Sequence, residues 1–316
     1  MNKSTREEIL KKLEKKQISK EKLLELGIDC FSEKTLERIF NCGNFIQAVM
    51  NVDRTSSKVV KANRCMNRFC PICMATKSRK DAYMLNIILE YLKSSFDYKF
   101  LFLTLTVPNV AGDELVTELN KQYEAIQRLT KRKEFKAVSR GYVRKTEITY
   151  NQERNDFHPH IHMLIAVDKK YFTSRFLYVK HSRWLELWKS CRQNDNISQV
   201  NIKKADTNSF KELSKYEAKD FEMLSYSQEV FEYFHNALHG RKTLTYNGCF
   251  HIGKKKFQNG ELDSFKETDP VEYVDTSFHS YELDISRYKL VKERELSKNE
   301  HLKFNNMKIM DERIIE

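Results

Sequence analysis

The feature that most constrains how this chain can fold is a group of cysteines near its amino terminus. Cys65, Cys70 and Cys73 lie together in the sequence RCMNRFCPIC. The two-residue spacer between Cys70 and Cys73 allows both thiolates to face a single tetrahedral ion. Cys42, in the sequence NCGNF, is the nearest candidate for a fourth ligand. The pattern therefore predicts a structural Zn²⁺ site that joins residues 42–73 into one small segment.

The same cysteines have a second interpretation, as buried thiols, since free cysteine commonly behaves as a small apolar side chain. The chain has 316 residues and seven cysteines, and an odd number in a chain without a secretory signal argues against a disulfide framework. Four of the seven fall within 32 residues, which favours metal binding over packing. Cys30, Cys191 and Cys249 have no such neighbours, and we expect them to pack as buried thiols.

The charge of the chain indicates a negatively charged partner. There are 56 lysines and arginines against 44 aspartates and glutamates, a net charge of +12. Clustered cations attract phosphates, so the partner could be DNA, RNA or an anionic membrane surface. The same charge would also be found on a basic surface that is solvated and has no dedicated partner. The most apolar stretch, 100–107, has the length of a strand, and the first 16 residues lack the apolar core of a secretory signal. We therefore expect a cytoplasmic protein without a membrane partner.

Hydrophobic periodicity divides the chain into four segments. Leucines and isoleucines at helical spacing predict a helical extension over 1–40, and the cysteine-rich segment with its following helix occupies 41–95. A central core spans 96–257, and a charged, weakly patterned tail spans 258–316. The expected elements are a two-stranded ribbon turning at 53–57, helices at 74–93, 115–129, 182–192, 209–224 and 228–239, strands at 100–107, 142–150 and 157–167, and a strand pair within 242–256.

The first motif that carries chemistry is HPHIH, on the strand predicted over 157–167. Side chains alternate across a strand, so His158, His160 and His162 share one face. Two imidazoles two residues apart can bind one divalent ion. A His-x-His pair is common by chance or as hydrogen-bonded core histidines, so the motif by itself indicates little.

The preceding strand adds a carboxylate to this motif. If the hairpin loop is centred between Glu153 and Arg154, Glu147 lies directly opposite His160. A His-His-Glu site with open positions suits Mg²⁺ or Mn²⁺. The register is an assumption, because a slip of one residue would turn Glu147 to the other face and leave it an ordinary exposed side chain.

A tyrosine on the helix predicted over 209–224 is a candidate nucleophile. Glu212, Tyr216 and Lys219 are spaced to project from one helical face. A phenol gains anionic character beside a cation or a metal ion. In isolation the segment is better interpreted as an exposed helix with one packed tyrosine. The strand FLTLT, with Thr104 and Thr106 on one face, fits packing unless the other motifs give it a function.

Taken in order, FLTLT, EITYN, HPHIHML and the Tyr-x-x-Lys helix resemble the HUH endonucleases (His, hydrophobic, His), and more narrowly the rolling-circle replication initiators of small plasmids from Gram-positive bacteria. The resemblance covers roughly residues 40–255, from the cysteine cluster to HNALHGRKTLTYNGCF. It implies an α+β fold in which an antiparallel-sheet HUH endonuclease core, ferredoxin- or RRM-like, carries an N-terminal zinc-binding segment and helical appendages.

The resemblance also implies roles for single residues. His160, His162 and Glu147 match the metal ligands, and His158 is an additional candidate. Tyr216 matches the nucleophile of the Y-x-x-K motif, and Lys219 matches the lysine of that motif. Glu212 matches the residue that activates water at termination. The implied reaction is metal-dependent nicking of plasmid origin DNA through a 5′-phosphotyrosine, followed by strand joining, with a host helicase and a host polymerase as partners. No further cofactor is implied, and the oligomeric state, monomer or dimer, stays open.

Three alternatives remain at this point. A zinc-ribbon DNA-binding protein without catalysis would explain the cysteines and the charge. A relaxase or a transposase of the HUH type would share the chemistry but serve another process. A metallohydrolase that uses the three histidines would act on small substrates and form no covalent DNA adduct.

Overall fold

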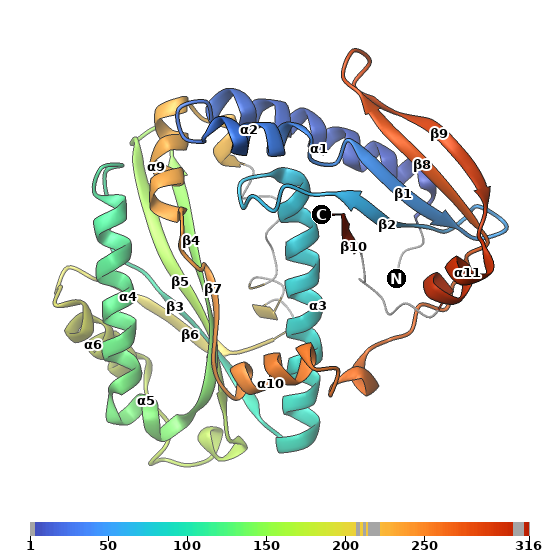
Figure 1. Cartoon of the computed structure of the whole chain (residues 1–316). Helices are drawn as coiled ribbons and strands as arrows, with labels where there is room; N and C mark the ends of the chain where they lie inside the picture. Colours follow the sequence, from blue (N-terminus) through green and yellow to red (C-terminus); the bar gives the residue numbers. More distant parts are fainter. Residues whose placement is uncertain (1–3, 207–208, 211–212, 214–221, 306–312, 316) are drawn as a thin grey trace. The chain divides into compact units, whose positions relative to one another are not determined.

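The computed structural model describes residues 4–206, 209–210, 213, 222–305 and 313–315. The chain forms two compact units. Unit 1 comprises Met1–Lys80, Tyr216–Phe231 and Lys266–Glu316, and unit 2 comprises Asp81–Lys215 and Glu232–Phe265. Each unit contains helices and a five-stranded sheet (Figure 1), so the α+β class predicted from the sequence is confirmed. The division into four segments stays a prediction.

Unit 2 is built on an antiparallel sheet. Its strands lie in the order β6 (Val200–Lys204), β3 (Lys99–Leu105), β5 (Asp156–Val167), β4 (Ser139–Asn151) and β7 (Leu244–Gly248). The central strands β3 and β5 are buried on both faces, which explains their almost continuous apolar sequence. The predicted strands and the hairpin of β4 and β5 are confirmed.

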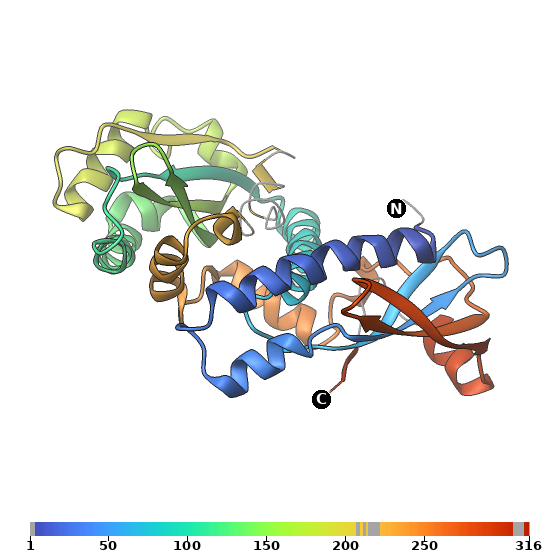
Figure 2. The same ribbon diagram turned by 90° about the horizontal axis from the view of Figure 1, so that it is seen from above.

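Helices cover both faces of this sheet (Figures 1 and 2). One face packs against α4 (Leu115–Lys131), α5 (Lys133–Val138) and α6 (His181–Arg192), whose buried Trp184 and Trp188 belong to the same core as alternate residues of β3 and β5. The other face packs against the second half of α3 (Pro71–Phe96) and Phe250 of α10 (Cys249–Gln258). The histidines of β5 project from this second face, next to the apolar residues Leu164 and Ala166 of the same strand.

Unit 1 contains a second sheet made from both ends of the chain. Its strands lie in the order β10 (Arg313–Ile315), β2 (Ser57–Asn63), β1 (Phe45–Met50), β8 (Asp275–Glu282) and β9 (Arg287–Glu295). All pairs are antiparallel except β10 with β2. This unit also contains α1 (Arg6–Leu26), α2 (Glu33–Phe40), η2 (Met223–Ser225), α11 (Lys298–Asn305) and the N-terminal part of α3.

The helix α1 packs on this sheet through Leu10 and Leu13, which contact the cluster formed by Ile46, Ala62 and Tyr288 (Figure 2). Thr5 caps the start of α1 through reciprocal hydrogen bonds with Glu8. The N-terminal helices expected from the sequence are therefore confirmed as elements, and α1 contributes to a core.

Two expectations for the C-terminal third need correction. The strand pair predicted within 242–256 is wrong, because β7 is followed directly by the helix α10 and pairs with β4 instead. Gly248, with φ of 55°, forms the turn into this helix. The weakly patterned tail contains β8 and β9, which extend the sheet of unit 1. Outside these strands, η1 (Lys169–Phe172), α9 (Gln228–Leu238) and η3 (Asp263–Phe265) complete the described elements.

Within the described part of the chain, no helix is both long enough and apolar enough to span a membrane.

Candidate metal centres

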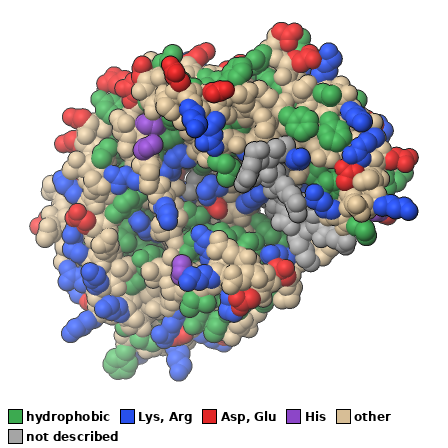
Figure 3. All heavy atoms as spheres, in the orientation of Figure 1, with side chains coloured by type: hydrophobic (Ala, Val, Ile, Leu, Met, Phe, Trp, Pro, Cys, Tyr) green, Lys and Arg blue, Asp and Glu red, His purple; other side chains and the backbone are tan. Residues whose placement is uncertain are grey.

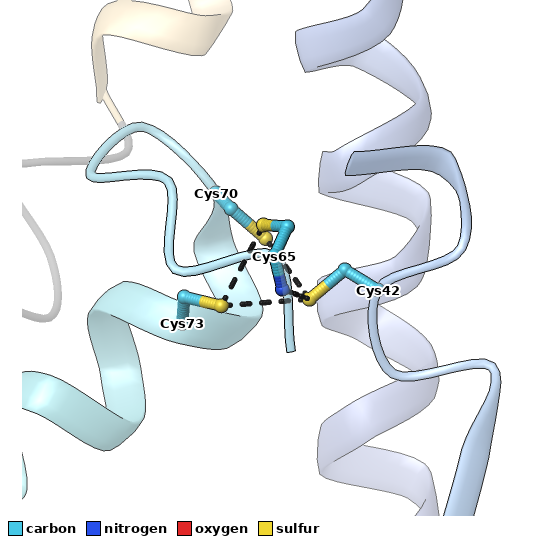
Figure 4. Close-up of side chains that lie close together, drawn as sticks. All are labelled: Cys42, Cys65, Cys70 and Cys73. Carbon is cyan, nitrogen blue, oxygen red and sulfur yellow. Dashed lines mark hydrogen bonds between the residues drawn. The ribbon is translucent and has the colours of Figure 1, made fainter. Parts of the chain in front are cut away.

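The four cysteines predicted as ligands come together in unit 1 and point into a single cluster (Figure 4). Cys42 lies between α2 and β1, Cys65 follows β2, and Cys70 and Cys73 lie at the start of α3. The sulfur of Cys73 is 3.5 Å from that of Cys42 and 3.6 Å from that of Cys65, and the sulfurs of Cys42 and Cys70 are 3.6 Å apart. All four residues are buried with free thiols.

These separations fit a tetrahedral zinc ion. With Zn–S bonds of about 2.3 Å, the sulfurs of a tetrahedral site lie about 3.8 Å apart. The backbone N–H of Cys65 donates to the sulfur of Cys42, and that of Asn67 donates to the sulfur of Cys65, both at 3.4 Å. Hydrogen bonds from neighbouring thiols lower the pKa of Cys42, and the hydrogen bond with Cys42 raises the pKa of Cys70. These contacts favour the thiolate form at Cys42, and the thiolate is the form in which sulfur binds metal.

Two distant parts of the chain hold the backbone around Cys42. The ammonium of Lys20, on α1, donates to the carbonyl oxygens of Phe40 at 2.6 Å and Cys42 at 3.1 Å. The hydroxyl of Tyr288, on β9, donates to the carbonyl oxygen of Gly43 at 2.6 Å. Lys20 is only 1% exposed, and burial lowers the pKa of its ammonium while the nearby thiols raise it. Because four thiolates around one zinc ion would leave an excess of negative charge, a buried cation here would balance part of it.

In unit 2, the hairpin of β4 and β5 brings a carboxylate and two imidazoles together. The register predicted from the sequence is confirmed, since Glu147 lies directly opposite His160. The Oε2 atom of Glu147 is 3.1 Å from Nε2 of His162 and 3.4 Å from Nε2 of His160. The candidate ligand atoms of the three residues all lie within 4.8 Å of one another, and both histidines are buried. We call Glu147, His160 and His162 the His-Glu cluster.

The other ring nitrogen of each histidine has a partner of its own. Nδ1 of His162 is 3.1 Å from the hydroxyl oxygen of Thr104, on β3. Nδ1 of His160 is 3.3 Å from the backbone carbonyl oxygen of His158. These contacts leave both Nε2 atoms facing Glu147. A partner at Nδ1 fixes which nitrogen is available to a metal ion, and it orients the ring.

This donor set fits a divalent ion. One carboxylate and two imidazoles, with open positions for water or substrate oxygen, suit Mn²⁺ and accommodate Mg²⁺. His158 lies outside the His-Glu cluster, with its ring centre 5.4 Å from that of His160. Burial, and secondarily the charge of His160, lowers the pKa of His158.

We expect Thr104→Val to weaken Mn²⁺ binding by about 10- to 100-fold, the usual loss when a residue that orients a metal ligand is removed. Valine keeps the shape of the side chain but cannot hydrogen-bond to His162. Electron paramagnetic resonance of free Mn²⁺ measures the affinity, and Thr104→Ser should restore it. Thr106→Val is the matched control, because its hydroxyl donates to the backbone of Gln199 at 3.0 Å. Equal losses in both valine variants would contradict an orienting role for Thr104.

Two further side chains support the site and were missed in the sequence. Lys145 is 3% exposed and lies directly opposite His162, so it projects from the same face as Glu147. Its position two residues before Glu147 is the signal that could have identified it. Gln122, on α4, donates to the carbonyl oxygen of Pro159 at 3.0 Å and so fixes the strand between the histidines. No local pattern in the sequence points to that contact.

The residues predicted to perform the covalent step, Tyr216, Glu212 and Lys219, lie outside the described residues. Of the helix predicted over 209–224, the structure describes only short parts. The site assignments for these three residues stay predictions.

Comparison with known proteins gives a consistent result. The profile of a family described as "Replication protein" matches residues 56–293, which include the His-Glu cluster. A "Protein rep" of Staphylococcus aureus is 42% identical over 195 residues, 61% of this chain and 85% of that protein. A "Protein rep" of Streptococcus pneumoniae is 32% identical over 251 residues, 75% of this chain and 77% of that protein. One from a Bacillus species is 27% identical over 264 residues, 75% of this chain and 85% of that protein. No solved structure matches the chain.

Proposed function

The chain belongs to the family of replication proteins, and on that premise we propose that it initiates rolling-circle replication of a plasmid by nicking and rejoining one DNA strand at the origin. The His-Glu cluster is the observation that carries this proposal. Holding a half-buried carboxylate between two buried imidazoles is costly unless the group serves a purpose such as binding metal. A DNA-binding protein without catalysis would account for the cysteines but not for this cluster.

The residues of the cluster have distinct tasks in the proposed reaction. A divalent ion, Mg²⁺ or Mn²⁺, would polarise the scissile phosphodiester and offset charge on the leaving oxygen. Glu147 contributes negative charge to the metal site, and His160 and His162 contribute their Nε2 atoms. Thr104 keeps the His162 ring in place. Lys145 adds a cation on the same face, where a phosphate would gain from it.

The covalent step is assigned to Tyr216. Its phenolate oxygen attacks the scissile phosphorus and forms a 5′-phosphotyrosine, while the bridging oxygen leaves with a proton as a free 3′-OH. Lys219 would stabilise the phenolate. The tyrosyl ester conserves the phosphodiester bond, so rejoining requires no nucleotide cofactor. The match to the Y-x-x-K motif supports this assignment.

Glu212 and the partners complete the proposal. At termination, Glu212 would act as a general base and direct water onto the new junction. The 3′-OH would prime a host polymerase, and a host helicase would open the duplex, since the sequence has no G-x-x-x-x-G-K-[ST] nucleotide-binding loop. A Zn²⁺ ion in the four-cysteine cluster would stabilise the surrounding segment. That segment would position the origin DNA through phosphate contacts, which set the register of a protein on DNA.

Incubation with a supercoiled plasmid that carries the cognate origin tests this function. With Mn²⁺ we expect nicked circles and a protein–DNA adduct that survives denaturation, and neither in buffer without added Mg²⁺ or Mn²⁺. Nicking without an added divalent ion, or nicking without an adduct in Mn²⁺, would contradict the proposed reaction. A plasmid that lacks the origin is the control for specificity.

A further inference from the structure

The loop that joins β5 to α6, residues 168–180, exposes aromatic side chains to solvent. Phe176 is 100% exposed, Tyr178 is 55% exposed and Phe172 is 36% exposed. One exposed apolar side chain is ordinary on a protein surface, but three aromatic ones within seven residues form a patch that indicates a binding partner. We call residues 168–180 the aromatic loop.

The aromatic loop is ordered before any partner binds. Tyr171 is buried in the core of unit 2, and its hydroxyl donates to the carbonyl oxygen of Val179, which ties the two ends of the loop together. Within the loop, the backbone N–H of Ser174 donates to Lys170 at 2.9 Å, and that of Tyr178 donates to Ser174 at 3.1 Å. A ring held out on an ordered loop loses little conformational entropy on binding.

Cations surround these rings. Lys169, Lys170, Arg175 and Lys180 all belong to the loop and are exposed. The only acidic residue of the loop, Asp168, is already paired with Arg140. Figure 3 shows lysine and arginine side chains beside hydrophobic ones at the lower left, where this loop runs in Figure 1. The loop is therefore basic as well as aromatic.

This chemistry favours nucleic acid over a protein partner. Single-stranded DNA is bound by aromatic rings on which its bases stack, together with cations that contact its phosphates. Lysine, which supplies three of the four cations here, is depleted at protein–protein interfaces. Lys204, on the adjacent edge strand β6, lies 5.4 Å over the ring of Phe172 and extends the basic surface.

We propose that the aromatic loop is a binding site for single-stranded DNA, in which Phe176 stacks on an unpaired base and Lys170 and Lys180 contact flanking phosphates. This inference rests on the proposed nicking function, and it places a second DNA contact in the same unit as the His-Glu cluster. His160 precedes the end of β5 by seven residues, or about 23 Å at 3.3 Å per residue. The stretch from His160 to the start of the aromatic loop alone corresponds to about seven stacked nucleotides at 3.4 Å each.

Fluorescence anisotropy with a labelled 30-nucleotide oligothymidine tests the proposal on the full chain. The buffer contains no added Mg²⁺ or Mn²⁺, so that binding is measured without cleavage and without removing Zn²⁺ from the four-cysteine cluster. We expect Phe176→Ala to weaken binding by about 5- to 100-fold, the usual effect of losing one stacking ring. Ile252→Ala, which removes another exposed apolar side chain of unit 2, should bind as the parent does. Phe176→Ala affinity equal to that of the parent would overturn the proposal.

The salt dependence of binding tests the cations separately. The slope of log K against log [salt] is negative, and each lost phosphate contact on single-stranded DNA reduces its magnitude by about 0.7. Lys170→Ala/Lys180→Ala should therefore reduce the magnitude by about 1.4. Lys121→Ala/Lys131→Ala, two exposed lysines on α4, is the matched control and should leave the slope unchanged. Equal slopes for parent and loop variant would overturn the phosphate contacts.

The outcomes also separate this inference from the proposed function. If the parent nicks origin DNA but Phe176→Ala binds oligothymidine normally, only the aromatic-loop proposal falls. If Phe176→Ala loses binding while the parent never nicks, only the nicking function falls. A variant that binds DNA normally but no longer binds a host protein would assign the loop to a protein partner and overturn the proposal.

Discussion

Replacing His162 with alanine is expected to reduce Mn²⁺-dependent nicking by at least about a thousandfold. A metal ion supplies several kcal/mol of transition-state stabilisation, and each 1.4 kcal/mol corresponds to a factor of about ten in rate. Nε2 of His162 lies 3.1 Å from the Glu147 carboxylate, so its loss removes one of three candidate ligands and leaves a half-buried carboxylate without that partner. Single-turnover nicking of an origin plasmid measures the effect.

His158→Ala is the matched control for this prediction. His158 projects from the same face of β5 but lies outside the His-Glu cluster. We expect a loss of no more than about tenfold, the low end of what a neighbour that only orients a ligand contributes. Equal losses in the His158 and His162 variants, or an His162→Ala variant that nicks at the parental rate, would contradict the assignment of the metal ligands.

The second large effect concerns the four-cysteine cluster. We expect the double variant Cys70→Ser/Cys73→Ser to lose one equivalent of zinc per chain and the fold of unit 1 with it. Zinc bound by four cysteines contributes an apparent 10–16 kcal/mol in small domains, about as much as the whole stability of a typical domain. The cluster also joins α2, β2 and α3 to α1 and β9 through Lys20 and Tyr288. Metal analysis and hydrogen exchange of the amides of β1 and β2 measure both effects.

Cys191→Ser controls for the loss of a buried thiol. Cys191 is 0% exposed but belongs to the core of unit 2 and is not one of the four cysteines of the cluster. This variant should keep its zinc and the protection of β1 and β2. Amides of β3 and β5 should stay protected in the double variant, because their core does not include the cysteines of the cluster. Zinc retained by Cys70→Ser/Cys73→Ser, or unchanged protection of β1 and β2, would contradict a structural metal.

The sequence predicted those parts of the fold that are determined by residues close together in the chain. The alternation in HPHIH and a short polar loop were enough to place Glu147 opposite His160, because the turn fixes the register of a hairpin. Cysteine spacing was enough to group four ligands, because two of them lie in one turn at the start of α3. In both cases a few residues determine the geometry.

The parts that the sequence did not reveal depend on contacts between distant segments. Lys20 looks like one more charge on an amphipathic helix, and only the fold shows that it reaches the carbonyl of Cys42. Tyr288 reaches Gly43 across 245 positions of sequence. The strands β8 and β9 were missed because β9 is an edge strand with mostly exposed residues, so no strict alternation marks it. The helix α10 was predicted as a strand because Asn247-Gly248 suggested a hairpin turn, whereas Gly248 begins a helix.

The role of Thr104 shows which part of the candidate site could not be predicted from the sequence. Its place in FLTLT suggested packing, and its hydroxyl acquires a function only because β3 pairs with β5 in the register that sets Thr104 opposite His162. That register joins strands separated by more than fifty residues, and no turn links them directly. Pairing of this kind is decided by the core as a whole, so the contact could not be derived from either motif.

Peptide mapping of the covalent DNA adduct tests the central claim most directly. The protein is allowed to nick origin DNA with Mn²⁺, the adduct is denatured and digested, and mass spectrometry identifies the peptide that carries the nucleotides. We expect a 5′-phosphodiester on Tyr216 in the parent, and no adduct from Tyr216→Phe. An adduct on another residue, or one that persists in Tyr216→Phe, would contradict the proposed nucleophile.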